Sequence, residues 1–519
     1  MDYDHEVRLS HSPEQVLQPI ERLYRSIART PAAVAIAGAP DGDITYAELG
    51  TRIAALAAAL QDIDPTPGSR VGICAGNTSE HLVALLATYA AGKVWVPLSP
   101  RNARAGLDAM IAATAPSIIV ADVTLVDRFT PSAAALVLAG DAPGSPSVRG
   151  LQEQWRGRTP GAIPRGEAEA QIIKFSGGST GVPKAVEQSQ RCVNAQAEGL
   201  RDFFEFRSDD VNLIVAPLTH GASCFVLPIL EVGGTHVLLD DTKPTAIFSA
   251  IERHAVTTMY APPTLLYSLI ESANEIPRNV SPLRHVIYSA APMPPQRIRD
   301  CQRALGNVIE TAYGQVEAPQ IIAAMRAHEL LDEENLTSVG RPSPVATLGI
   351  MSPDGTLLAP GEVGEIVVRG PLLMTGYLDK PDETARTIID GWLHTGDLGT
   401  MDDRGYLFIR GRLREVINTG GFKVYPAEVE ASLVRNAAVT ECAVFGIADA
   451  KWGEAVHAAV VLGAGTSVGE AELIAWVKQE LGSVKAPKRI TFVEHLERNA
   501  AGKVSRAGVR ESLQRRHPA

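Results

Sequence analysis

The sequence predicts an α/β fold: a large N-terminal domain of layered α/β subdomains, which includes a small β subdomain, followed by a small α+β domain. Three observations support this prediction. Short β-branched runs alternate with helical patterns in the first half, turn-rich strands follow from about residue 340, and the pattern changes again beyond Gly411. The large domain is therefore expected over residues 1–410, with its β-rich part at about 340–410, and the small one over 411–519.

In the first half, short β-branched runs predict strands, with helical patterns between several of them. These runs are Arg70–Ala75, Ser117–Ala121, Leu136–Ala139, Thr257–Tyr260 and Arg284–Tyr288. A helix is expected over Glu80–Ala91, before Gly92. Another should begin near residue 46, because Thr45 and Glu48 match a capping box. This alternation is typical of parallel α/β layers.

The last third of the chain has two different patterns of predicted secondary structure. Pro353, Asp354, Gly355, Pro360 and Gly361 punctuate Thr347–Val368, which predicts short strands joined by turns. Beyond Gly411 the pattern predicts three strands and one helix, at Thr440–Phe445, Val456–Leu462, Arg489–Val493 and Gly469–Leu481. We expect a separate domain of about a hundred residues there.

Composition excludes several classes of protein. The 519 residues carry 59 acidic and 48 basic side chains, a net charge of −11, and 45% are hydrophobic. This length predicts two to four domains with an ample core. The acidic balance argues against a nucleic-acid binder, which needs clustered Lys and Arg. Five scattered cysteines indicate neither a zinc site nor a disulfide framework, so a reduced cytosolic setting is expected.

One segment has the length and apolar character of a membrane span. Val211–Leu230 carries no charged residue, but Pro217, His220, Gly221 and Pro228 interrupt it. We therefore expect a buried segment that folds around a site. Because residues 1–20 also lack an apolar core stretch, no secretory signal is predicted. We expect a soluble cytoplasmic protein.

The stretch Phe175–Lys184 reads FSGGSTGVPK and carries the most information about chemistry. Its glycines allow backbone amides to approach a polyphosphate, Ser179 and Thr180 supply hydroxyls, and Lys184 supplies a cation. It is not the GxxxxGK[ST] loop, because Pro183 precedes the lysine and no Ser or Thr follows it. A plain Gly/Ser surface loop is the alternative for such a stretch, but the whole string is more restrictive than its glycine count.

This string resembles the phosphate loop of the adenylate-forming superfamily, which includes acyl-CoA synthetases, peptide-synthetase adenylation domains and luciferases. Further motifs of that family follow in the expected order, so the resemblance covers residues 175–503. They are Tyr313–Glu317 (YGQVE), Trp392–Asp397 (WLHTGD), Gly411–Glu415 (GRLRE), the Gly420–Glu430 loop and Asn499–Lys503 (NAAGK). The probability that this series of motifs matches by chance is very small.

The resemblance implies a nucleotide site, with Tyr313 stacking on the adenine beside Ser289–Ala291 and Asp397 accepting both ribose hydroxyls. A buried core tyrosine is the competing reading for Tyr313. A solvated aspartate would accept these bonds at low cost, and the planar Arg412 guanidinium suits ribose or phosphate oxygens. The residues implied to bind ATP or AMP are Ser176, Gly177, Gly178, Ser179, Thr180, Gly181, Lys184, Ser289, Ala290, Ala291, Ala312, Tyr313, Gly314, Gln315, Asp397 and Arg412.

The resemblance also assigns catalytic and conformational roles. Lys503, Thr180, Glu317 and His220 are the implied catalytic residues. Glu317 and Thr180 would hold Mg²⁺, and Lys503 would lie between the substrate carboxylate and the α-phosphate. Arg414 would be the hinge of a mobile C-terminal domain. The loop Gly420, Gly421 and Phe422 would line the coenzyme A tunnel, and the acid pocket would comprise His220, Gly221, Ala222, Ser223, Gly314 and Ala318.

Several residues depart from the family pattern. Val316 replaces the usual Thr and removes a hydroxyl worth roughly 1 to 3 kcal/mol. Ala185 stands where Gly often follows the loop lysine, and Gln190 where many CoA ligases have His. Gly221 stands where amino-acid-activating domains have an Asp, which disfavours an α-amino acid because its buried ammonium would lack a counter-charge.

The predicted function is an ATP-dependent carboxylic acid:CoA ligase that forms acyl-AMP and pyrophosphate, then acyl-CoA and AMP. Small residues at 221–223, 290–291 and 314 suggest a roomy pocket for an aromatic, alicyclic or medium-chain acid, unless Tyr260, Phe225 or Met259 fills the space. Two alternatives stay open: an enzyme that loads an acyl carrier protein, and a non-catalytic nucleotide-binding protein. The expected partners are the acid, ATP and CoA, in a monomer or a homodimer.

Overall fold

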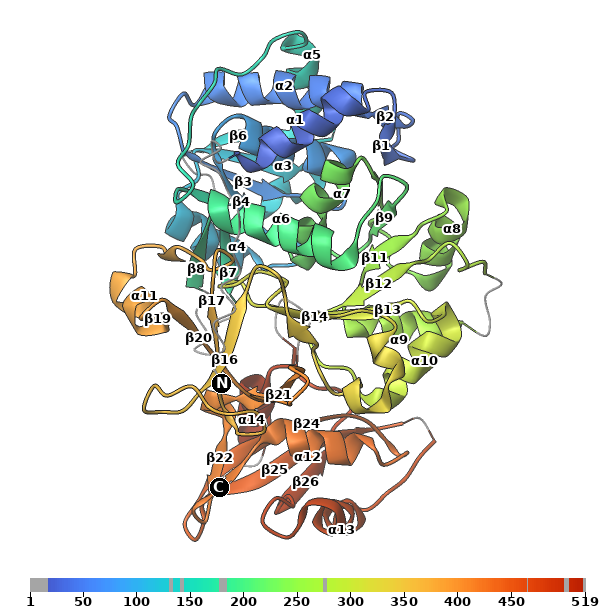
Figure 1. The fold of residues 1–519 in the computed structure, drawn as a ribbon, viewed down its shortest axis with the longest axis vertical. Coiled ribbons are helices and arrows are strands. Elements are labelled where there is room, and N and C mark those ends of the chain that lie inside the picture. The colour runs from blue at the N-terminus through green and yellow to red at the C-terminus, as the bar shows by residue number, and fades with distance from the viewer. Residues whose placement is uncertain are drawn as a thin grey trace.

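The computed structural model describes residues 17–129, 134–140, 144–176, 184–273, 278–463, 465–498 and 504–516. In Figure 1 the N-terminal elements, coloured blue to green, lie at the opposite end of the molecule from the last sheet, coloured orange to red. The strands β16, β17 and β20 lie between these two ends. The predicted fold class is confirmed: layered α/β elements come first, a small β sheet follows, and an α+β unit ends the chain.

Within the described ranges, the largest sheet has nine strands, and its central strands are parallel. In spatial order these are β15 (Arg341–Pro342), β14 (Ala323–Met325), β13 (Ile309–Tyr313), β12 (His285–Tyr288), β11 (Thr258–Tyr260), β9 (Val211–Ile214), β10 (Thr235–Leu238), β1 (Val34–Ala37) and β2 (Ile44–Thr45). Because β9, β11, β12 and β13 run in one direction, their carboxyl ends share one edge, where open α/β sheets bind ligands.

A second sheet, of seven strands in the described residues, contains the strand that precedes the expected phosphate loop. Its order is β18 (Gly376–Tyr377), β8 (Lys184–Ser189), β7 (Ala170–Ser176), β4 (Val94–Pro97), β3 (Arg70–Cys74), β5 (Ile118–Asp122) and β6 (Ala135–Ala139). The strands β7 and β8 are antiparallel, so Ser176 lies opposite Lys184 across the mouth of that loop. The helices of this large region are α1 (Pro19–Arg29), α2 (Tyr46–Ile63), α3 (Ser79–Ala90), α4 (Arg104–Thr114), α5 (Val148–Gln154), α6 (Gln190–Phe204), α7 (Val226–Val232), α8 (Pro244–His254), α9 (Pro263–Ser272) and α10 (Pro295–Leu305).

Local sequence signals account for several boundaries. The helix α2 begins at Tyr46 because the Thr45 hydroxyl accepts a hydrogen bond from the Glu48 amide, as the capping pattern predicts. The segment Val211–Leu230 does not form one long helix: it comprises β9, the 3₁₀ turn Gly221–Phe225 and most of α7. No helix in the described part of the chain combines the length and the apolar character that crossing a membrane requires.

Two small sheets complete the fold in the described residues. One contains β16 (Thr347–Met351), β17 (Gly364–Arg369), β20 (Trp392–Met401), β19 (Ile388–Ile389) and β21 (Leu407–Arg412), with α11 (Pro381–Thr387) beside it. The other contains β23 (Phe422–Val424), β22 (Ile417–Thr419), β25 (Gly453–Leu462), β24 (Val439–Asp449) and β26 (Arg489–Phe492), with α12 (Pro426–Val434), α13 (Glu470–Leu481) and α14 (Arg506–Arg516). The last sheet has its own hydrophobic core, built around Val424, Val456 and Val477.

Candidate functional site

Asp397, on β20, is the centre of the expected nucleotide site. The Tyr313 hydroxyl donates to its Oδ2 at 2.6 Å, and the Gln315 amide donates to the same oxygen at 2.7 Å. The register of β20 and β21 puts Arg412 opposite, with its Nε 2.6 Å from Oδ1. Asp397 is only 4% exposed, so the expectation that it stays partly solvated is wrong: three protein donors take the place of water.

Tyr313 is therefore both buried and polar. It ends β13, and burial together with the neighbouring Asp397 carboxylate raises the pKa of its hydroxyl, so the phenol stays a donor. Ser289 follows the adjacent strand β12 and is also buried, as is Ala312. Ala290 and Ala291 are exposed beside them. Ala290 has a φ of +78°, a strained conformation of the kind that clusters at functional sites.

Packing within the protein itself leaves no room for a side chain at Gly314. A Cβ at this position would lie 2.4 Å from the backbone nitrogen of Gln320. The space that the sequence suggested for a ligand is therefore filled here by the protein's own chain. The space beside Gly221 is likewise occupied, since a Cβ there would lie 2.6 Å from the Tyr260 hydroxyl. At these two positions the space is filled, and at Gly221 it is filled by Tyr260, one of the residues that the sequence offered as the alternative.

Tyr377 joins two expected phosphate-site residues and was missed by sequence reasoning. Its hydroxyl donates to Glu317 Oε1 at 3.0 Å, while the Lys184 ammonium lies 4.7 Å from the centre of its ring. Lys184 also pairs with Glu383 of α11 at 2.7 Å. Burial and the Glu317 carboxylate raise the pKa of Tyr377. No motif in the sequence points to this role, which follows from the pairing of β18 with β8.

The expected acid pocket is built on the turn that follows β9. His220 is half-buried, and its Nδ1 lies 2.9 Å from the Thr219 hydroxyl. Ser223 is half-buried in the same turn, whereas Ala222 and Ala318 are buried in the core. The turn is held from β7 by Lys174, whose ammonium bonds both the His220 carbonyl and the Ser223 hydroxyl. No motif in the sequence points to this lysine.

In the C-terminal region, Gly420 and Gly421 form the two-residue loop of the β22–β23 hairpin. Both have positive φ, +57° and +84°, which only glycine adopts at low cost. The next residue, Phe422, is 60% exposed. Arg414 lies in a short 3₁₀ turn, Leu413–Glu415, between β21 and β22. The loop and the hinge candidate thus belong to neighbouring segments.

Arg506 anchors this region and was also missed. From α14 it bonds the Glu430 carboxylate through Nε and Nη2, at 2.8 and 2.6 Å, and it pairs with Glu415 beside Arg414. The two carboxylates outweigh the effect of burial and raise the pKa of its guanidinium. Through Glu415, the expected hinge is therefore tied to α14, which is itself bonded to α12.

Six expected site residues lie outside the described residues. These are Gly177, Gly178, Ser179, Thr180 and Gly181 of the phosphate loop, and Lys503 of the C-terminal motif. The described residues on both sides of the loop, Ser176 and Lys184, bracket its position.

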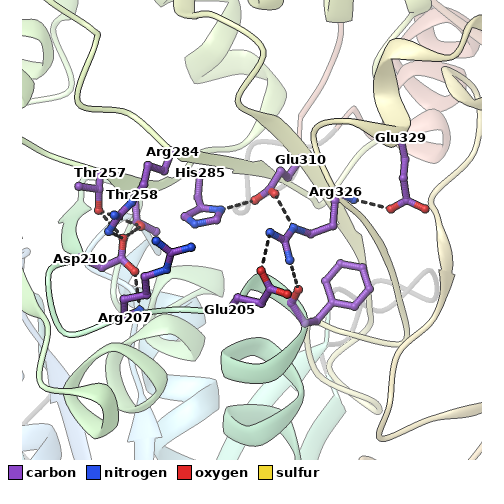
Figure 2. Close-up of polar contacts among 11 residues, drawn as sticks. Glu205, Arg207, Asp210, Thr257, Thr258, Arg284, His285, Glu310, Arg326 and Glu329 are labelled. Carbon is purple, nitrogen blue, oxygen red and sulfur yellow. Dashed lines mark hydrogen bonds and ion pairs between the residues drawn. The ribbon is translucent and has the colours of Figure 1, made fainter.

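A second polar network lies at the amino ends of the same parallel strands (Figure 2). Asp210, whose side chain is fully buried, accepts hydrogen bonds from the Thr257 hydroxyl and from Arg284, each at 2.6 Å. Burial opposes ionisation of Asp210, but these bonds prevail and lower its pKa. Beside them, the buried Glu310 carboxylate contacts His285 Nδ1 at 2.8 Å and accepts from Arg326 Nε at 3.2 Å. The charges of this network are compensated within the protein.

The fold and the site define an AMP-binding enzyme. Residues 23–378 match the model of the AMP-binding enzyme family, and residues 428–503 match that of the AMP-binding enzyme C-terminal domain. The chain belongs to this family.

Several proteins of named activity align with this chain over nearly its whole length. Feruloyl-CoA synthase of an Amycolatopsis species is 34% identical over 476 residues, covering 90% of this chain and 93% of the relative. Indoleacetate–CoA ligase of Aromatoleum aromaticum is 32% identical, covering 92% and 94%. Among solved structures, amide bond synthetase McbA from Marinactinospora thermotolerans superimposes with a TM-score of 0.86 at 30% identity, covering 95% of this chain and 99% of that one.

Proposed function

We propose that this protein is an ATP-dependent carboxylic acid:CoA ligase. The substrate carboxylate attacks the α-phosphorus of ATP and expels pyrophosphate, which leaves an acyl-adenylate. The thiol of coenzyme A then attacks the acyl carbon and expels AMP, which leaves a thioester. The observation that carries the proposal is the similarity to CoA ligases along nine-tenths of the chain, together with the Tyr313–Gln315–Asp397–Arg412 cluster.

In this proposal Asp397 binds the ribose hydroxyls after exchanging some of its present donors for them. Tyr313 and Ser289–Ala291 flank the adenine at the carboxyl ends of β12 and β13. Ser176, the phosphate loop and Lys184 hold the phosphates. Lys503 approaches the reacting carboxylate and α-phosphate, where developing negative charge is largest.

Glu317 fits the role of a magnesium ligand. Its Oε1 accepts the Tyr377 hydroxyl, and its Oε2 accepts no hydrogen bond from the described residues. One or two carboxylates are the usual protein contribution to Mg²⁺ that is shared with nucleotide phosphates. Glu317 and Thr180 would hold the ion, which would neutralise charge on the departing pyrophosphate.

Residues 411–519 would act as a mobile domain with its hinge at Arg414. One orientation would bring Lys503 to the site for adenylation, and the other would bring Gly420, Gly421 and Phe422 for thioester formation. The exposed Phe422 and the sharp glycine turn before it suit a surface that contacts a narrow substrate arm.

The substrate would be an aromatic, alicyclic or medium-chain acid and not an α-amino acid, because Gly221 supplies no counter-charge for an ammonium. The cytoplasmic location expected from the sequence stays a prediction.

The test is pyrophosphate release from ATP and Mg²⁺ across aryl, alicyclic and fatty acids, with and without CoA. We expect release that becomes catalytic and yields a thioester only with CoA. If release stops after a single turnover with CoA present and becomes catalytic when a purified acyl carrier protein is added, the carrier protein is the acyl acceptor. Binding of ATP without acid-dependent release would contradict the proposal.

A further inference from the structure

Lys174 is a buried cation in the wall of the expected acid pocket. It lies on β7, is only 8% exposed, and packs its ammonium 5.5 Å from the centre of the fully buried Trp95 ring. Nζ donates to the His220 carbonyl at 3.2 Å and to the Ser223 hydroxyl at 2.9 Å. Both acceptors belong to the turn after β9 that carries the acid-pocket residues.

The described residues supply no counter-charge to Lys174. Among the described residues no Asp or Glu oxygen lies within 4.0 Å of Nζ, and its two acceptors are neutral. An ammonium has three N–H donors, so one stays unused by the described residues. Burying a lysine without a counter-charge is costly.

Another buried lysine shows how this protein satisfies an ammonium that has only a structural role. Lys93, 1% exposed, has three oxygen acceptors: the carbonyls of Asp64 and Thr66, at 2.6 and 3.4 Å, and the Ser69 hydroxyl, at 2.6 Å. All three of its donors are therefore used. Among the described residues Lys174 has one acceptor fewer than Lys93, and both of its acceptors belong to the acid-pocket turn.

The position of Lys174 relates it to the reacting end of the substrate. Lys174 and Ser176 are two residues apart on β7, so their side chains point to the same face, separated by about 7 Å along the strand. Ser176 directly precedes the expected phosphate loop. A substrate with its carboxylate at the α-phosphate would therefore extend toward Lys174 over a few bonds.

We propose that Lys174 binds a second carboxylate of the substrate, so that the acid activated by this enzyme is a dicarboxylic acid. The proposal rests on the proposed ligase function. A substrate carboxylate would accept the unused N–H and neutralise the buried charge, forming a charge-assisted hydrogen bond. The same ammonium would repel the α-ammonium of an amino acid, which agrees with the absence of a counter-charge at Gly221.

The test compares kcat/KM for matched acids: adipate with hexanoate, and 3-(4-carboxyphenyl)propanoate with 3-phenylpropanoate. The wild-type enzyme should favour at least one diacid over its monoacid by about 10- to 100-fold, the range for a hydrogen bond to a charged group. Lys174→Met should abolish or reverse this preference, and Lys174→Arg should keep part of it. Lys93→Met, the matched control, should leave the ratio unchanged.

Several results would overturn the inference. The first is equal use of both members of each pair by the wild-type enzyme. The second is equal use of adipate and 5-oxohexanoate, whose far end is a neutral ketone. The third is an equal loss for both members in Lys174→Met, which would give the lysine only a structural role. The wild-type ratios decide the matter even where Lys174→Met does not fold. If monoacids release pyrophosphate and diacids do not, only this inference fails; if no acid does, the proposed function fails with it.

Discussion

At the amino ends of the parallel strands, Asp210 is bonded by Thr257 and Arg284, and Glu310 by His285 and Arg326. On the side where the expected site lies, Glu317 keeps one carboxylate oxygen unbonded by the described residues, and Lys174 has no carboxylate partner among them. Both regions are rich in polar side chains. The two acids of the amino-end network have partners within the protein, whereas Glu317 and Lys174 each keep bonding capacity that the described residues do not use. Asp397, also on the site side, is bonded by Tyr313, Gln315 and Arg412, so the contrast concerns these individual groups.

The amino-end network should matter for stability alone. Asp210→Ala removes a fully buried carboxylate and leaves Arg284 with only its exposed partner Asp209, so we expect the free energy of unfolding to fall by about 3 to 5 kcal/mol. Chemical denaturation measures this loss. The kcat/KM of the folded variant should equal that of the wild-type enzyme, and a large drop in kcat/KM would break the proposed separation of the two regions.

Lys503→Ala should affect chemistry and leave stability unchanged. Removing a cation from the developing charge should slow adenylation by about 100- to 1,000-fold, measured as acid-dependent pyrophosphate release. Thioester formation from supplied acyl-AMP should be largely retained, because that step would use the Gly420–Gly421 loop. Equal loss of both half-reactions would contradict the proposed domain rotation.

Val316→Thr should speed adenylation, because it restores a hydroxyl near the expected position of the α-phosphate. Val316 is half-buried, and its carbonyl accepts a hydrogen bond from Gln188, which should hold the backbone in place. We expect adenylation to become about tenfold faster, equivalent to about 1.4 kcal/mol. An unchanged or slower rate in single-turnover assays would show that this site does not use the hydroxyl.

The smallest expected effect is on the stability of the protein at low pH. The folded-state pKa of Asp210 is lowered, so its contribution to stability is present above its unfolded pKa of about 3.9 and is lost as pH falls through the folded value. Asp210→Asn should therefore flatten the decline of stability below about pH 4. Unfolding curves between pH 3 and 7 measure this, and parallel curves for the two proteins would refute it.

The sequence predicted those features of the fold that depend on neighbouring residues, such as helix starts and strand positions. Thr45 and Glu48 predicted the start of α2, and the β-branched runs predicted β3, β5 and β12. Ser289 could be assigned to a strand end because it follows the run Arg284–Tyr288. The place of Tyr313 at the end of β13 was not predicted from the pattern. The motif at Trp392–Asp397 identified the carboxylate around which the described site residues gather.

Long-range contacts could not be predicted in this way. Arg506 reaches Glu430, and Lys174 reaches Ser223, across 76 and 49 residues. The burial of Asp397 depends on Arg412 being opposite it in the β20–β21 register. Gly314 and Gly221 looked like room for a ligand, but that space is occupied by Gln320, six residues along the chain, and by Tyr260, which the sequence offered as an alternative without deciding it.

The most direct test of the proposed chemistry follows one oxygen atom. A substrate acid labelled with ¹⁸O in its carboxylate is incubated with the enzyme, ATP, Mg²⁺ and CoA, and the products are analysed by mass spectrometry. Attack of the carboxylate on the α-phosphorus predicts AMP that carries one ¹⁸O, formed together with the thioester. Label in inorganic phosphate with formation of ADP, or a thioester formed with unlabelled AMP, would contradict adenylation.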